Sequence, residues 1–263
     1  MYDMHIHIIP EIDDGAKDLE TTIAMLKIAA QNGTTKIVAT PHVIEGNWLP
    51  DWDTILAGCK KVKNAADELG IKMDIYPGGE VAMHMDILEH IKGPGPYCIN
   101  GGRYLLVELP AAEVPDYAED FFFILQTRGI TPIIAHPERH PILAKDPNKL
   151  ADWINKGILT QMNFSSLIGK MGERAMKTAE LFIANNMIYI AGSDAHSTRT
   201  RNPDMTQGIS RLQSLIGSER TNNIINVNPK AIVDNQDVFI NEIAKVQMKD
   251  KSNLLNKILS VFK

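Results

Sequence analysis

The chain opens with Tyr2-Asp3-Met4-His5-Ile6-His7-Ile8-Ile9-Pro10, a stretch that has the apolar content of a buried β-strand and carries two histidines two positions apart. Side chains alternate between the two faces of a strand, so His5 and His7 point to the same side and two ring nitrogens can reach one cation. A single histidine on a strand is more often a buried polar side chain than a ligand. The meaning of this pair therefore depends on what the other strands carry at the same end.

Short runs of β-forming residues alternate with helical patterns along most of the chain, as in βα units around a parallel sheet. The predicted strands are 2–9, 36–40, 73–81, 104–109, 131–136, 158–163 and 187–193. The predicted helices are 19–31, 52–69, 115–128, 148–156 and 173–185. Glycines follow four of these helices where a C-cap favours that residue, at Gly33, Gly70, Gly129 and Gly157. Seven such units predict an α/β fold that is either a barrel or a doubly wound sheet.

The length of 263 residues suits one barrel, because α/β barrels commonly use about 250 residues as a single domain. No shift in composition divides residues 1–220, so we expect one barrel domain over residues 1–245. Residues 246–263 differ, because lysines there are interspersed with large apolar side chains. They predict a basic amphipathic tail or helix, which packs on its own barrel or a neighbouring subunit, or else docks on a membrane surface or a partner.

Charge and cysteine content exclude several classes of protein. The 27 Lys and Arg residues against 32 Asp and Glu residues give a formal net charge of −5, which excludes a generally basic nucleic-acid binder. Cys59 and Cys98 cannot supply a disulfide framework, which indicates a reducing compartment. The N-terminal stretch lacks a basic leader, and no run of about 18 apolar residues occurs. We therefore expect a cytoplasmic protein without a transmembrane segment.

Nearly every predicted strand leads into a residue type that binds metal ions. Catalytic groups of α/β barrels come from the C-terminal ends of the strands and the loops after them. Strand 158–163 is the exception, because it ends only in Gln161 and Asn163. Histidine and carboxylate without thiolate suit Mn, Fe or Zn, and so many ligands indicate more than one metal ion. The candidate ligands are His5, His7, Asp14, His42, Glu80, Glu108, His136, Asp194 and His196.

Such a site favours a phosphate-like anion. Three divalent ions would outweigh the four candidate carboxylates and leave a net positive charge. Arg139 follows His136, and Arg201 follows His196, each within five residues of a candidate ligand. A guanidinium group matches phosphoryl oxygens in bidentate geometry, so Arg139 and Arg201 are candidate phosphate-binding residues, with Arg199 a weaker one.

The sequence does not support cysteine-dependent phosphatase chemistry, which needs five residues between the nucleophilic cysteine and an arginine. Only four separate Cys98 from Arg103, and Cys59 has Ala65 at the required place. No Gly-x-Ser-x-Gly turn and no P-loop occurs either. The predicted nucleophile is therefore a metal-activated water molecule. The aromatic stretch that contains Trp48 either packs on the core or forms a lip that grips a phenyl ring of the substrate.

These segments together resemble the PHP (polymerase and histidinol phosphatase) superfamily. They are most similar to its bacterial manganese-dependent protein-tyrosine phosphatases from capsule and exopolysaccharide operons, over roughly residues 1–245. The matching segments run in family order. They are Asp3-Met4-His5-Ile6-His7-Ile8-Ile9-Pro10, Ile12-Asp13-Asp14-Gly15-Ala16, Ala39-Thr40-Pro41-His42, Gly78-Gly79-Glu80-Val81, Leu106-Val107-Glu108-Leu109-Pro110, Ala135-His136-Pro137-Glu138-Arg139 and Gly192-Ser193-Asp194-Ala195-His196.

The resemblance implies a distorted (βα)7 TIM-like barrel with three metal ions, of which Mn²⁺ is the first candidate and Fe or Zn the alternatives. By position, the first metal would be held by His5, His7, Glu80 and Asp194. Glu80 would bridge to a second metal at Glu108 and His136, and Asp14, His42 and His196 would hold the third. Arg139 and Arg201 match the phosphate-facing arginines of the family.

The implied activity is hydrolysis of phosphotyrosine in a protein, in the regulation of capsule or exopolysaccharide synthesis. The implied partner is a bacterial tyrosine autokinase. Two other functions stay open on the same scaffold, namely a small-molecule phosphomonoesterase similar to histidinol phosphatase and a catalytically silent metal-binding domain. An amidohydrolase ranks lower, because this chain has Glu108 where that family typically uses a lysine.

Overall fold

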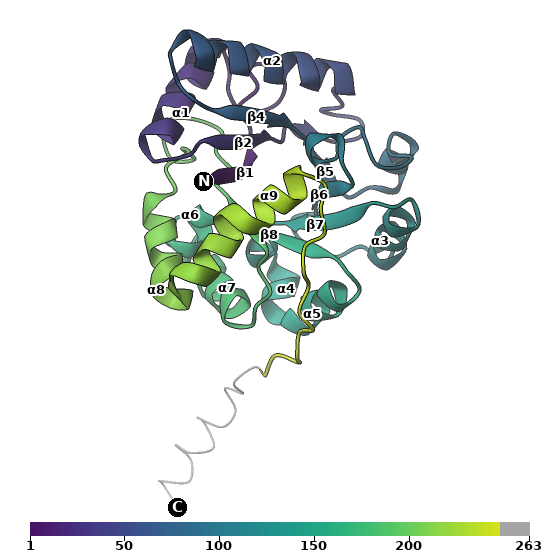
Figure 1. Ribbon diagram of the computed structural model, residues 1–263. Coiled ribbons are helices and arrows are strands. Elements are labelled where there is room, and N and C mark those ends of the chain that lie inside the picture. The colour runs from purple at the N-terminus through teal and green to yellow at the C-terminus, as the bar shows by residue number, and fades with distance from the viewer. Residues whose placement is uncertain (248–263) are drawn as a thin grey trace, which may run out of the picture.

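The computed structural model describes residues 1–247, in which helices surround a curled parallel sheet (Figure 1). One sheet has the strand order β1 (Tyr2–Ile6), β2 (Lys36–Ala39), β4 (Asp74–Pro77). The other has the order β3 (His42–Val43), β5 (Glu80–Ala82), β6 (Tyr104–Glu108), β7 (Thr131–Ala135), β8 (Leu159–Asn163), β9 (Ile190–Gly192). Every pairing between these strands is parallel.

The last strand returns to the first. A parallel bridge joins Ile6 to Ala195, and the amide of His7 donates to the carbonyl of Ala195 at 2.9 Å. Earlier in β1, the buried carboxylate of Asp3 accepts hydrogen bonds from the amide of Ser193 at 2.8 Å and from its hydroxyl at 2.6 Å. These bonds join β1 to the end of β9, so the sheet curls into the predicted barrel.

At two positions around the barrel, a strand of one sheet is followed within a few residues by a strand of the other. This division explains why the barrel contains two sheets. The predicted strand 73–81 is split into β4 and β5 at Gly78-Gly79, and the predicted strand 36–40 is followed by β3 after Thr40-Pro41. Proline has no amide hydrogen to donate to a ladder, although the carbonyl of Pro41 still accepts from Glu80 N at 2.9 Å. Counted around the barrel, β2 with β3 and β4 with β5 each fill one position, which accounts for the predicted seven strands within residues 1–247.

Helices cover the outside of the sheet. The five predicted helices are present as α1 (Leu19–Gln31), α2 (Trp52–Glu68), α3 (Ala118–Thr127), α5 (Pro147–Asn155) and α7 (Glu173–Ala184). Gly33, Gly70, Gly129 and Gly157 have positive φ, as predicted for C-caps. The structure also contains α4 (Pro141–Lys145), α6 (Phe164–Leu167), α8 (Thr206–Asn222) and α9 (Asn228–Val233), with the short η1 (Met85–Glu89), η2 (Ile99–Gly101), η3 (Pro137–Arg139) and η4 (Asn223–Val227).

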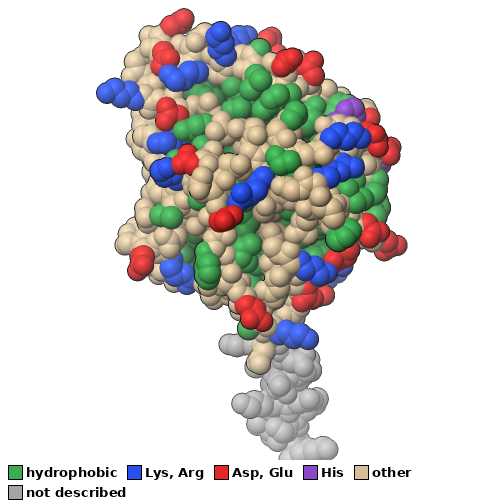
Figure 2. All heavy atoms as spheres, turned by 45° about the vertical axis from the view of Figure 1, so that its right-hand side comes forward, with side chains coloured by type: hydrophobic (Ala, Val, Ile, Leu, Met, Phe, Trp, Pro, Cys, Tyr) green, Lys and Arg blue, Asp and Glu red, His purple; other side chains and the backbone are tan. Residues whose placement is uncertain are grey.

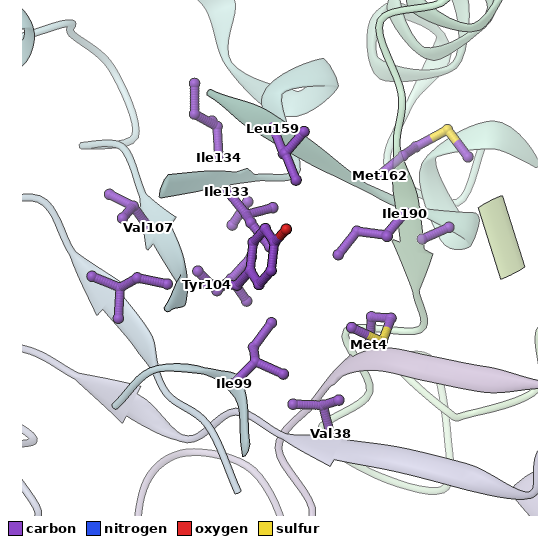
Figure 3. Close-up of a cluster of buried hydrophobic side chains, with 14 of the residues drawn as sticks. Met4, Val38, Ile99, Tyr104, Val107, Ile133, Ile134, Leu159, Met162 and Ile190 are labelled. Carbon is purple, nitrogen blue, oxygen red and sulfur yellow. The ribbon is translucent and has the colours of Figure 1, made fainter. Parts of the chain in front are cut away.

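Apolar side chains from separate strands fill the barrel. Met4, Tyr104, Ile133, Leu159 and Ile190 gather there from five strands, and all are buried (Figure 3). Large branched and aromatic side chains of this kind make a barrel interior a packed core and not a pore.

The N-terminal end of the barrel is covered. There α9 crosses in front of the sheet (Figure 1), and the chain after it is tied to the barrel by the hydroxyl of Tyr104, which donates to the carbonyl of Gln236 at 2.6 Å. Farther along, Asn155 accepts from the amide of Ile243 at 2.8 Å. The opposite end, at the carboxyl ends of the strands, is therefore the one left for a site.

No helix within residues 1–247 is long and apolar enough to cross a membrane. On the face drawn in Figure 2, basic and acidic side chains are interspersed. The predicted basic tail, residues 246–263, lies outside the described residues except for its first two, so its structure and its contacts stay a prediction.

The closure between β9 and β1 depends on the absence of a side chain at Gly192. A Cβ atom there would lie 2.7 Å from the backbone nitrogen of His5, closer than real contacts allow. We expect Gly192→Ala to lower the free energy of unfolding by roughly 1–3 kcal/mol, because the backbone at His5 would have to move to make room for the methyl group. Gly93→Ala is the matched control, since its nearest neighbour would lie 3.7 Å away at Arg128. Urea unfolding of both variants checks this, and equal stabilities would contradict it.

Candidate metal centre

The structure brings all nine candidate ligands to the C-terminal end of the barrel. They come from distant parts of the chain, and the parallel strands place them at one mouth. Most are buried, whereas the side chain of Asp14 is 45% exposed and that of Glu108 30%. The positions are His5 in β1, His7 and Asp14 after it, His42 at the start of β3, Glu80 at the start of β5, Glu108 at the end of β6, His136 after β7, and Asp194 and His196 after β9.

Two histidine nitrogens and a carboxylate oxygen meet at the centre of the cluster. The Nε2 atoms of His5 and His7 lie 3.2 Å apart, and each is 3.3 Å from Oε2 of Glu80. Asp194 Oδ1 lies 3.6 Å from both nitrogens. This is the group of four that the family resemblance assigns to one metal ion, and its donor atoms converge on one point.

The second oxygen of Glu80 faces another part of the site. Its Oε1 lies 3.0 Å from Nε2 of His136, which in turn is 3.6 Å from Oε1 of Glu108. Donor atoms of His42, Glu80 and Glu108 also lie within 4.8 Å of one another. Glu80 therefore stands between two groups of ligands, in the place of a bridging carboxylate.

A third group lies on the other side of His7. Asp14 Oδ1 is 3.5 Å from Nε2 of His42 and 3.3 Å from Nε2 of His196. His7 is within reach of the same point, since one donor atom from each of His7, Asp14, His42 and His196 lies within 4.8 Å of the others.

Two buried nitrogens in this region have no hydrogen-bond partner among the described residues. They are Nδ1 of His42 and Nε2 of His196. Nδ1 of His42 lies 3.2 Å from Glu80 Oε2 but without the alignment of a hydrogen bond. A buried polar atom without a partner costs free energy, and a divalent cation would satisfy such lone pairs. The donor set therefore fits metal ions chemically.

Burial and neighbouring charges shift the pKa values of three candidate ligands. Two of them, His196 and Asp194, have lowered pKa values and are deprotonated. Burial and the neighbouring His7 lower the pKa of His196 to about 2, so its imidazole is neutral at physiological pH. Burial opposes ionisation of Asp194, but the positive charge of His5 and His136 holds the pKa of Asp194 well below its usual value. Burial and the negative charge of Glu80 raise the pKa of Glu108 to about 7.

Two ligand positions have a strained backbone. His136 directly follows β7, and Asp194 lies two residues after the end of β9; both have positive φ, 31° and 52°. Residues other than glycine rarely adopt this conformation, and it persists only where the surroundings enforce it. Here it turns both side chains back over the mouth of the barrel.

Asp13 contacts two candidate ligands, and the sequence analysis did not select it. Its Oδ2 accepts from Nδ1 of His7 at 2.7 Å and from the amide of His42 at 3.0 Å, and its Oδ1 accepts from the amide of Gly15 at 2.9 Å. Although burial alone would lower the pKa of His7, hydrogen bonds to Asp13 and Glu80 raise it to about 10. A carboxylate behind a ligating histidine fixes the ring orientation. The acidic pair Asp13-Asp14 was the available signal.

Both candidate phosphate-binding arginines contact Asp194. Arg139 Nη1 donates to Asp194 Oδ2 at 2.9 Å, and Arg201 Nη2 donates to Asp194 Oδ1 at 2.6 Å. Each guanidinium group keeps further donors, and each side chain is about a third exposed. Arg139 lines a pocket of about 110 Å³ with Glu108 and His136, and Arg201 lines a groove of about 770 Å³ with Asp14 and His196.

The two tryptophans after β3, Trp48 and Trp52, lie in different surroundings. The sequence predicts that this stretch either packs on the core or forms a lip for a phenyl ring. Trp52 packs against the core, as in the simpler interpretation. Trp48 instead stacks on the ring of His42, with centroids 5.4 Å apart and planes 13° apart. Trp48 thus lies beside a candidate ligand, where its role toward a substrate stays a prediction. Arg199 is exposed and lines the larger groove.

A parallel (βα) barrel whose strand ends converge in histidines and carboxylates, with arginines beside them, defines the class of TIM-like barrels built to hold catalytic metal ions. The family described as "Capsular polysaccharide synthesis, CpsB/CapC" matches residues 1–234. The chain belongs to this family.

Two relatives and one solved structure show which proteins the chain is similar to. The putative tyrosine-protein phosphatase CapC of Staphylococcus aureus is 37% identical over 201 residues, which cover 76% of this chain and 79% of the relative. The tyrosine-protein phosphatase YwqE of Bacillus subtilis is 30% identical over 239 residues, covering 91% and 94%. The fold superimposes with a TM-score of 0.85 and 29% identity on a crystal structure from work on YwqE of B. subtilis and CpsB of Streptococcus pneumoniae, described there as unique metal-dependent tyrosine phosphatases. That match covers 94% of this chain and 100% of the other.

The contacts of Asp13 generate a prediction about metal affinity. In Asp13→Asn, the amide nitrogen must face either Gly15 N on one side or His7 and His42 N on the other, so a donor meets a donor. We expect Mn²⁺ affinity to fall by about 10- to 100-fold, as measured by isothermal titration calorimetry. Asp18→Asn is the control, because Asp18 caps α1 through Thr21 N and asparagine caps equally well. Equal affinities in the two variants would show that Asp13 does not orient His7.

Proposed function

We propose that this chain is a metal-dependent protein-tyrosine phosphatase. The observation that carries the proposal is the position of Glu80, whose two oxygens face separate groups of histidines and carboxylates at a mouth flanked by two arginines. Membership of the CpsB/CapC family and the names of the relatives support the same activity. The proposed role is regulation of capsule or exopolysaccharide synthesis, with a tyrosine autokinase as the phosphoprotein partner.

The proposed cofactor is a set of three divalent cations, with Mn²⁺ as the first candidate and Fe or Zn as alternatives. His5, His7, Glu80 and Asp194 would hold the first ion, Glu80, Glu108 and His136 the second, and Asp14, His42 and His196 the third. The interatomic distances support this division, with two adjustments. His7 is also close to the third group, and His42 is also close to Glu80 and Glu108.

The ions, when bound, would lower the pKa of a water molecule and neutralise phosphoryl charge. The residues of the chain supply the rest of the mechanism. The free donors of Arg139 and Arg201 would bind equatorial phosphoryl oxygens from opposite sides of Asp194 and orient the phosphorus for in-line attack. Glu80 and Asp194 would be ligands held in a fixed position by their burial.

The leaving group decides the preferred substrate. A tyrosinate has a conjugate acid with a pKa of about 10, so it departs with less help from a general acid than a serine alkoxide does. Aryl phosphates should therefore be hydrolysed fastest. Trp48, at the edge of the site on His42, is the proposed contact for the phenyl ring.

Metal removal tests the core of the proposal. We expect EDTA to abolish hydrolysis of p-nitrophenyl phosphate and Mn²⁺ to restore it. His136→Ala and Asp194→Ala should lose about 100-fold or more in activity, because each removes a ligand. Metal content by mass spectrometry and activity at saturating Mn²⁺ are the measurements. Undiminished activity in either variant, with no contaminating phosphatase, would refute the mechanism.

Substrate comparison separates this function from its alternatives. Phosphotyrosine peptide should give a higher kcat/KM than phosphoserine peptide or histidinol phosphate. A reversed ratio toward histidinol phosphate would indicate a small-molecule phosphatase. A protein that binds Mn²⁺ but hydrolyses none of these would be a silent metal-binding domain.

The arginines have their own test. Arg201→Ala should lower kcat/KM for p-nitrophenyl phosphate by about 10²- to 10³-fold, because one donor set for the transition state is lost. Arg201→Lys should recover only part of this, since lysine lacks the planar fork. Arg211→Ala is the control, because Arg211 pairs with Glu180 outside the site. Wild-type kinetics in Arg201→Ala would exclude a phosphate-binding role.

A further inference from the structure

Strand β8 is the exception among the strands, because it contributes no candidate metal ligand. It ends in Gln161 and Asn163, which alternate along the strand and therefore point to the same face. Both side chains are completely buried. Burying two amides in a barrel interior costs free energy unless every polar atom finds a partner, so their presence needs a reason.

These two amides link a histidine of β1 to the carboxylate after β9. Nδ1 of His5 lies 3.0 Å from Gln161 Oε1. Gln161 Nε2 donates to Asn163 Oδ1 at 2.9 Å, and Asn163 Nδ2 donates to Asp194 Oδ2 at 2.7 Å. The series thus runs from His5 through Gln161 and Asn163 to Asp194, and both of its ends are candidate ligands of the same metal ion.

The direction of every bond in this series follows from its last member. An ionised carboxylate only accepts hydrogen bonds, so Asn163 must present its NH2 group to Asp194 and its oxygen to Gln161. Gln161 must then donate with its nitrogen, which leaves its oxygen facing His5. Since that oxygen can only accept, Nδ1 of His5 must carry the hydrogen.

A second, independent contact gives the same orientation of the Gln161 amide. The backbone amide of His136 donates to Gln161 Oε1 at 3.3 Å, and a backbone N–H can only donate. Gln161 Nε2 also donates to the carbonyl of Met162 at 2.8 Å. Both ends of the Gln161 amide are therefore fixed by groups whose roles are unambiguous. Nδ1 of His5 carries a hydrogen in either protonation state, so when the imidazole is neutral its lone pair is on Nε2, which faces His7 and Glu80.

We propose that Gln161 and Asn163 are positioning residues, which hold His5 in the tautomer that binds a metal through Nε2 and hold Asp194 in the orientation that completes the same site. The inference rests on the proposed metal centre. It also explains why β8 needs no ligand of its own: it orients ligands from β1 and β9.

The test compares Gln161→Leu with Gln161→Glu, using Mn²⁺ affinity of the full chain from isothermal titration calorimetry. Leucine removes the acceptor for His5, so the affinity should fall by about 10- to 100-fold. Glutamate keeps an acceptor for His5 and for the amide of His136 but loses the hydrogen bonds that Gln161 Nε2 donates to Asn163 Oδ1 and the carbonyl of Met162, so its affinity should lie between those of the wild type and Gln161→Leu. If Gln161 only fills space, the order should be reversed, because glutamate buries a charge and leucine does not.

Controls separate this from a folding defect. Met162→Leu changes the neighbouring residue of the same strand, whose buried apolar side chain points to the opposite face of β8 from Gln161, and should leave Mn²⁺ affinity unchanged (Figure 3). In the Zn²⁺-loaded protein, the Nδ1 proton of His5 should give a downfield NMR resonance in the wild type that is lost in Gln161→Leu. A Gln161→Glu variant that does not fold leaves this resonance and the affinity of Gln161→Leu as the deciding measurements.

The outcomes also separate this inference from the proposed function. A wild-type protein that binds no Mn²⁺ would refute the metal centre itself. A wild-type protein that binds Mn²⁺ and hydrolyses aryl phosphates, beside a Gln161→Leu variant with the same affinity and the same resonance, would refute the positioning role alone.

Discussion

The constraint on which the site depends is the burial of one carboxylate among several imidazoles. Glu80 is 1% exposed and lies within 3.3 Å of nitrogens from His5, His7, His42 and His136. Burial opposes its ionisation, but the charge of His5 and hydrogen bonds from His136, His5 and His7 hold the pKa of Glu80 well below its usual value. A charged group in such a place needs neighbours that cannot move, and the closed barrel supplies them. The fold and the chemistry therefore depend on each other at this residue.

Much of the site was predictable from sequence because parallel strands impose a common direction. Once His5, Glu108 and His136 are assigned to strand ends, they must meet at one edge, whatever their separation in the chain. The breaks in the wall were less predictable. Gly78-Gly79 reads equally well as a strand interior, and only the approach of a neighbouring strand shows why it splits, since a Cβ on Gly79 would lie 2.9 Å from Val43.

The supporting residues were harder to find for a different reason. Gln161 and Asn163 contact His5 and Asp194, which come from other parts of the barrel, and Asp13 contacts His7 and the amide of His42. Apart from the acidic pair Asp13-Asp14, no local pattern in the sequence reports these contacts. The ion pairs of Arg139 and Arg201 with Asp194 were missed in the same way: the sequence places each arginine near a ligand but does not show that both reach the same carboxylate. Local spacing thus predicts the candidate ligands, and tertiary contacts show how they are oriented.

The shared contact of the two arginines with Asp194 has a consequence for turnover. Each guanidinium group already interacts with a carboxylate, so an incoming phosphoryl group gains less from them than it would from unpaired arginines. The same holds for inorganic phosphate after the reaction, which resembles the substrate in charge but lacks its aryl group. A site whose cationic groups are partly neutralised at rest should therefore release inorganic phosphate more readily than one with unpaired arginines, at the expense of some affinity for the substrate.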